Sequence, residues 1–85
     1  MSKEEIYEKV KDIVAEELSI PTADVRSDSY LADDLGADSI DEVDILMRIE
    51  DEFNISVEEN KLSPNYMTIN DVVELIYEYP NVKEL

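Results

Sequence analysis

Apolar residues recur at steps of three and four positions in three stretches of the chain, a spacing that predicts amphipathic helices. The stretches are residues 2–18, 39–53 and 68–79. Each starts at or beside a good helix-capping residue with an acid three positions later, as in Ser2 and Glu5. The apolar stripes should share one core, and their members are Ile6, Val10, Ile13, Val14 and Leu18, then Ile45, Leu46, Ile49 and Phe53, then Ile69, Val72, Val73 and Ile76.

Residues 19–38, between the first two helices, are rich in turn-forming side chains. Pro21 ends the first helix, because the residue before a proline is pushed toward extended geometry. A helical turn is expected near residues 22–25. Loops of this length are usually functional or held down by their own side chains. The apolar residues expected to hold this loop to the core are Ile20, Val25, Tyr30, Leu31 and Leu35.

The last third of the chain is less regular. A short helix is expected over residues 57–62, and Pro80 is expected to stop the last helix, leaving residues 81–85 as a frayed tail. The predicted fold class is therefore all-α. It is a small bundle of three main helices plus a short fourth, with a long loop between helices one and two, in one domain over residues 1–85.

The composition excludes several kinds of chemistry. The 85-residue chain has no cysteine and no histidine, so it cannot form disulfides, thiolate or imidazole metal sites, or a Ser-His-Asp or Cys-His catalytic centre. It also lacks the D-x-D-x-D-G pattern of a calcium loop. No metal site is predicted. An enzyme using only carboxylates has no motif in its favour, so the protein is not expected to be an enzyme.

The formal net charge of −16 argues against binding to nucleic acid or anionic lipid and favours basic partners. No apolar run reaches membrane-spanning length and the N-terminus lacks a signal-peptide core, so a cytoplasmic location, or its equivalent in an organelle matrix, is expected without membrane insertion. The acids are densest over residues 33–59, where one base, Arg48, accompanies eleven acids: Asp33, Asp34, Asp38, Asp41, Glu42, Asp44, Glu50, Asp51, Glu52, Glu58 and Glu59.

A serine lies where the long loop passes into the second helix. Gly36, the only glycine of the chain, allows a sharp turn just before it. Asp38 and Ser39 are both suitable N-caps, with Asp41 and Glu42 three residues on. A well-capped helix alone would explain this pattern. However, the hydroxyl should be exposed, and a helix N-terminus favours an attached phosphate.

Gly36-Ala37-Asp38-Ser39-Ile40 resembles the attachment motif of acyl carrier proteins, Gly-x-Asp-Ser-Leu, at the start of the second helix. The resemblance extends over nearly the whole chain. It implies that Ser39 is esterified to 4'-phosphopantetheine, with Ile40 where leucine is usual. The implied role is that of a carrier, because the arm supplies the thiol that the cysteine-free chain lacks.

The same resemblance implies surfaces for partners and cargo. In this family the helix after the serine meets basic residues of partner enzymes, here a holo-carrier-protein synthase (a phosphopantetheinyl transferase), acyltransferases and ketosynthases. Ile40 and Met47 are expected to form a small exposed apolar spot, the alternative being packing against the loop or another helix. The expected docking residues are Asp38, Ile40, Asp41, Asp44, Met47, Glu50 and Asp51. Residues that would line an acyl pocket, or else a dry core, are Val43, Leu46, Leu62 and Ile69.

The leading interpretation is a freestanding, monomeric acyl carrier protein of fatty acid synthesis. Carriers for polyketides, other lipids or activated amino acids are the nearest alternatives, although amino-acid carriers commonly show Gly-Gly-x-Ser and are less acidic. An alternative from another class is an acidic helical adaptor without a prosthetic group.

Overall fold

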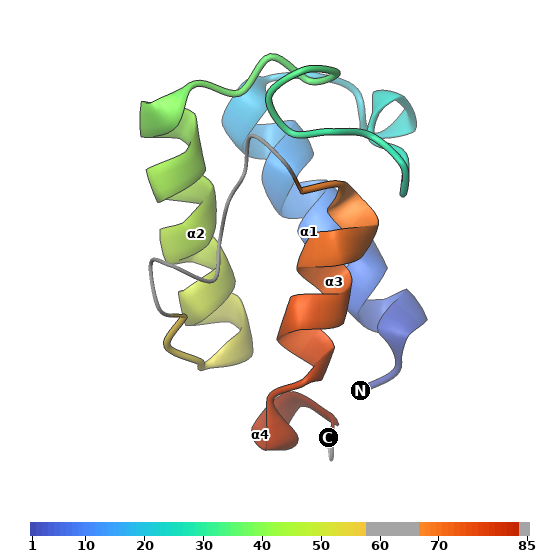
Figure 1. The fold of residues 1–85 in the computed structure, drawn as a ribbon, viewed down its shortest axis with the longest axis vertical. Coiled ribbons are helices and arrows are strands. Elements are labelled where there is room, and N and C mark those ends of the chain that lie inside the picture. Colours follow the sequence, from blue (N-terminus) through green and yellow to red (C-terminus); the bar gives the residue numbers. More distant parts are fainter. Residues whose placement is uncertain (58–66, 84–85) are drawn as a thin grey trace.

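The structure is a computed structural model that describes residues 1–57 and 67–83. Its helices in chain order are α1 (Lys3–Leu18), the short 3-10 helix η1 (Thr22–Asp24), α2 (Ser39–Phe53), α3 (Ile69–Tyr77) and α4 (Pro80–Lys83). Figure 1 shows α2 and α3 running in the same direction, whereas α1, which crosses behind α3 in this view, runs the opposite way. The fold class expected from the sequence is confirmed, and α1 packs against both α2 and α3.

The core is built from the predicted apolar stripes. All the listed stripe members are buried except Leu18 and Leu46, which are half-buried. Burying such side chains is worth roughly 1.5–3 kcal/mol each relative to exposure, so these contacts hold the bundle together. No helix in the part of the chain that the structure describes is long and apolar enough to cross a membrane.

Reciprocal capping boxes begin all three main helices. The Ser2 hydroxyl accepts from the Glu5 N–H, and the Thr68 hydroxyl accepts from the Asp71 N–H. In each box the carboxylate of the acid accepts from the backbone N–H of the capping residue. The box of α2 is described below with the site. Because a helix N-terminus leaves its first N–H groups without intrahelical partners, each box stabilises the start of its helix by about 1 kcal/mol.

The long loop passes over the end of the bundle from α1 to α2, as Figure 1 shows. Val25 and Leu31 are buried, and η1 forms where the helical turn was expected. The expectation for Tyr30 was wrong, since this side chain is 41% exposed.

Backbone hydrogen bonds fasten the same loop to the start of α3, because the Ser27 and Ser29 carbonyls accept from the Asn70 and Ile69 N–H groups at 2.8 and 3.0 Å. The loop is therefore tied to α3 through its backbone as well as to the core through its side chains.

The C-terminal segment differs from the expected frayed tail. Residues Pro80–Lys83 form α4, and Val82 is 0% exposed. The Asn81 side-chain amide donates to the Phe53 and Asn54 carbonyls at 3.3 and 3.0 Å, which ties α4 to the end of α2. Proline ends one helix but suits the first position of the next, and burial of Val82 stabilises the new turn.

The short helix expected over residues 57–62 lies outside the described residues from 58 onward, as does Leu62.

We expect Val82→Ala to lower the free energy of unfolding by about 2 kcal/mol, because two buried carbon atoms are removed and a cavity remains. For a domain of this size that corresponds to a fall in Tm of about 8–16 °C. Urea titration and thermal melts followed by circular dichroism would measure it, with exposed Glu78→Ala as the control. A neutral Val82→Ala would show that the segment contributes nothing to the fold.

Candidate functional site

A tight turn delivers the candidate serine to the start of α2. Gly36 has φ +74°, a left-handed conformation that favours glycine. The Gly36 N–H donates to the Ala32 carbonyl at 3.0 Å and the Ala37 N–H donates to the Leu31 carbonyl at 2.9 Å. Ala37 is buried whereas Gly36 is exposed. The turn therefore has one residue anchored in the core immediately before the helix begins.

Asp38 is the N-cap of α2. Its Oδ1 accepts from the Asp41 N–H at 2.9 Å, and Asp41 Oδ2 accepts from the Asp38 N–H at 3.1 Å. The sequence left Asp38 and Ser39 as equal candidates for this role. With Asp38 as the cap, Ser39 is the first helical residue, its side chain is exposed, and its hydroxyl makes no hydrogen bond with the described residues. The hydroxyl is thus available for chemistry.

Carboxylates around the helix start have shifted proton affinities. The pKa of Asp38 is lowered, chiefly because the Asp41 N–H donates to its ionised form. The pKa of Glu42 is raised, first because the side chain is partly buried and then because Asp38 and Asp41 repel its charge. The N-terminus of α2 therefore has a firmly ionised cap beside an acid that is costly to ionise.

An anionic ester would fit at Ser39. The oxygen is solvent-exposed and unbonded within the described residues, and it lies at the positive end of the α2 dipole. Three residues earlier, Gly36 also borders open space, since a Cβ built there would meet nothing within 4 Å. These features match what a phosphodiester-linked group needs: an accessible hydroxyl, room, and a favourable local potential.

The outer side of α2 carries an exposed apolar strip, defined as Ile40, Val43 and Met47, which are 71%, 56% and 59% exposed. The strip lies opposite the buried residues of the same helix, and exposed Asp44 and Asp51 lie beside it. Isolated apolar residues are normal on a surface, but three large ones together on one helix favour contact with another molecule. Ile40 and Met47 are therefore exposed, as the sequence predicted.

Arg48, the one base among the acids of α2, points toward α1. Its Nη2 lies 2.6 Å from Glu16 Oε2 and its Nη1 lies 3.2 Å from Glu17 Oε1. These bonds raise the pKa of the guanidinium, Glu16 contributing most. Sequence periodicity placed Arg48 off the core stripe but gave no sign of its partners, because they belong to another helix. The outer side of α2 is left with acids and apolar residues.

Three acids expected to meet partners also bond within the chain. Asp38 and Asp41 form the capping box, and Asp41 is half-buried. Glu50 is half-buried as well, and its Oε2 accepts from the Val57 N–H at 2.9 Å. Glu50 therefore holds the turn that follows α2, a role that the local sequence did not indicate.

The described candidate acyl-pocket residues differ in their burial. Ile69 is buried in the core, Leu46 is half-buried, and Val43 lies in the exposed strip. The structure does not bring Val43 into the interior, because the outward arc of α2 carries it away from the buried stripe.

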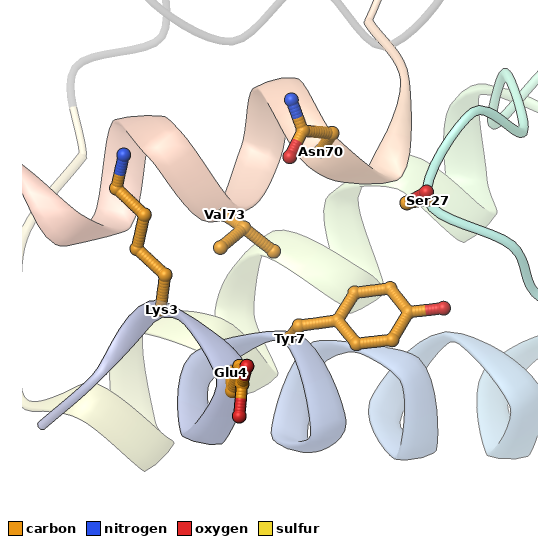
Figure 2. Close-up of a pocket in the computed structure, with 6 residues that line it drawn as sticks. All are labelled: Lys3, Glu4, Tyr7, Ser27, Asn70 and Val73. Atoms are coloured by element: carbon orange, nitrogen blue, oxygen red, sulfur yellow. The ribbon is translucent and has the colours of Figure 1, made fainter.

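Among the surface hollows lined by described residues are two that Val43, Leu46 and Ile69 do not line. The first, of about 260 Å³, lies between α1 and α2 beside Ile13 and Arg48. The second, of about 270 Å³, lies between α1 and α3, and Figure 2 shows it with α2 behind these helices. Tyr7 and Val73 extend toward its centre, and Lys3 rises from α1 toward α3. This second hollow is therefore on the side of the bundle away from α2.

Comparisons with protein families and with individual proteins point to the same family. Residues 8–76 match the family described as "Phosphopantetheine attachment site". The chain is 42% identical to an acyl carrier protein of Prochlorococcus marinus over 76 residues, covering 89% of this chain and 94% of the relative. It is 43% identical to one of Thermotoga maritima over 75 residues, covering 88% and 91%. It is 37% identical to one of Petrotoga mobilis over 84 residues, covering 99% and 98%.

We expect Glu42→Gln to stabilise the protein at pH 7. A folded-state pKa above the unfolded value means that the folded state holds the proton more tightly, so ionised Glu42 opposes folding. The gain should be at most about 0.5 kcal/mol, because the side chain is partly exposed and screened. It should disappear as the pH falls below the ordinary value of 4.5, where both states are protonated.

Thermal melts of the two proteins between pH 7 and pH 3.5 would measure this difference. Glu8→Gln removes one charge from an exposed α1 position and is the matched control. An equal gain from both substitutions would attribute the effect to overall net charge and contradict the local cause.

Proposed function

Because the chain belongs to the acyl carrier protein family, whose members carry acyl groups on covalently attached 4'-phosphopantetheine, we propose that Ser39 is the attachment point in this protein. The observation that carries the proposal is the exposed, unbonded Ser39 hydroxyl at the first position of α2. Proteins of this family are carriers that act with separate enzymes. When bound, the group supplies the thiol that holds the acyl chain as a thioester.

The residues around Ser39 have distinct tasks in this proposal. Asp38 caps α2 in place of the serine, which leaves Ser39 Oγ available to act as a nucleophile once, when a transferase esterifies it. Gly36 makes the turn before the helix start, and Ala37 anchors that turn in the core. The α2 dipole favours the negative phosphodiester at Ser39 Oγ.

The outer side of α2 is the proposed docking surface for the phosphopantetheinyl transferase and acyl-handling enzymes. Ile40 and Met47 offer apolar contact, and exposed Asp44 and Asp51 offer charges for basic residues of a partner. Arg48 does not oppose these charges because Glu16 and Glu17 bind it. Exposed ion pairs are individually weak, so the complexes should form quickly, dissociate quickly and depend on salt.

The proposed pathway is fatty acid synthesis, with the protein acting as a cytoplasmic monomer. Acyltransferases and ketosynthases with basic docking patches are the proposed later partners. The pathway proposal is supported by the likeness of this chain to freestanding bacterial acyl carrier proteins along most of their length. A screen of synthases from fatty acid and polyketide systems would test the pathway separately from the attachment.

Ser39→Ala should abolish attachment of the group, because no oxygen remains at the proposed position. Intact mass spectrometry after incubation with coenzyme A and a phosphopantetheinyl transferase would measure it. Ser56→Ala, at another exposed serine, should load like the wild type. Loading of a folded Ser39→Ala variant would assign attachment to a different residue.

Asp44→Asn combined with Asp51→Asn should raise the KM of the carrier in the loading reaction by about three- to tenfold, because two exposed charge contacts are lost. The difference from the wild type should shrink as salt is added. Asp12→Asn with Asp24→Asn removes the same charge from exposed positions on other elements and is the matched control. An equal rise in both pairs would locate the effect in net charge instead of in α2.

A further inference from the structure

The exposed apolar strip of α2 contains one oxidisable side chain. Met47 is 59% exposed and lies four residues after Val43 and seven after Ile40, in line along the outer side of the helix. The other methionines, Met1 and Met67, are half-buried. Sulfur accessibility controls the rate at which a thioether is oxidised. Met47 is therefore the methionine of this chain most open to a dissolved oxidant.

The charges around Met47 affect which oxidants can reach it. Asp44 and Asp51, three residues before and four residues after it, place exposed carboxylates on the same side of α2. Arg48 next to it is bound to Glu16 and Glu17 on α1 and offers no compensating charge there. A negative surface repels anionic oxidants but not neutral ones such as hydrogen peroxide.

From this placement we propose that Met47 is a reversible oxidation site that controls docking of partner enzymes on α2. A sulfur lone pair attacks one oxygen of hydrogen peroxide, an S–O bond forms and the O–O bond breaks. The sulfur is oxidised by two electrons and keeps that oxygen, whose proton passes to the departing hydroxide, which leaves as water. The product is methionine sulfoxide, which methionine sulfoxide reductases convert back with two electrons from a dithiol reductant, releasing the oxygen as water.

Oxidation would alter docking without unfolding the bundle. The sulfoxide is polar and strongly hydrated, so a partner that covers the strip must remove water from it without a matched hydrogen bond. The fold should persist, because Met47 is exposed and the core stripe of α2 consists of Ile45, Ile49 and Phe53. This inference rests on the proposed docking of partners on α2.

The test compares carrier treated with hydrogen peroxide, then freed of it, with untreated carrier. Peptide mass spectrometry should find Met47 oxidised several-fold faster than Met1 or Met67. The KM of the oxidised wild type in phosphopantetheinyl transfer should rise by about three- to tenfold, with kcat and far-ultraviolet circular dichroism little changed. Methionine sulfoxide reductases should restore the original KM.

Met47→Leu is the matched variant, because leucine keeps the apolar volume but cannot be oxidised. Its KM before and after peroxide should be the same, whereas Met67→Leu should respond to peroxide as the wild type does. An unchanged KM in oxidised wild type, or an equal response of Met47→Leu, would overturn the inference. If untreated carrier were never loaded, the proposed function would fail first, so the two failures are distinguishable.

Discussion

The hydrogen bonds between Asp38 and Asp41 are the contacts on which the rest of the site depends. They set the first residue of α2, and with it the position of every other side chain on that helix. Because the Asp38 carboxylate accepts from the otherwise unpaired Asp41 N–H, the hydroxyl of Ser39 is not needed to cap the helix. The same helix phase puts Ile45, Ile49 and Phe53 in the core, and Ile40 and Met47 in solvent.

A second constraint is the excess of acidic residues over basic ones. The chain has 23 acidic and 7 basic residues, so the positions of the basic side chains decide which surfaces stay negative. Lys3 pairs with Glu74 and Lys9 with Glu52, while Arg48 binds Glu16 and Glu17. These bonds connect α1 to α3 and α2. They leave the outer side of α2 negative, and the repulsion among its like charges opposes folding.

The far end of α2 is held by groups distant in sequence. Glu50 accepts from the Val57 N–H, Asn81 donates to the carbonyls at the end of the helix, and the Tyr79 hydroxyl donates to the Ser56 carbonyl at 3.1 Å. The two ends of α2 are therefore stabilised differently. Local capping secures the start beside Ser39, whereas at the finish the hydrogen bonds from Tyr79 and Asn81 add to a local cap, in which the Asn54 N–H donates to the Glu50 carbonyl.

The sequence by itself determined the features that rest on local spacing. Helical periodicity and capping pairs predicted the three main helices and their buried stripes, and the glycine before an Asp-Ser pair predicted where the loop passes into α2. Such features depend on residues within one helical turn of each other, so the sequence is enough to predict them. The sequence could not decide whether Asp38 or Ser39 is the cap, because both residue types make the same hydrogen bond.

Only the tertiary structure decided the partners of side chains that reach across the bundle. It turned Arg48 to α1, assigned Glu50 to the Val57 N–H, kept Val43 outside and buried Val82 in a segment expected to fray. Each result depends on which distant element fills the space beside the residue. A chain pattern records the polarity of a position, but not the group that will satisfy or cover it.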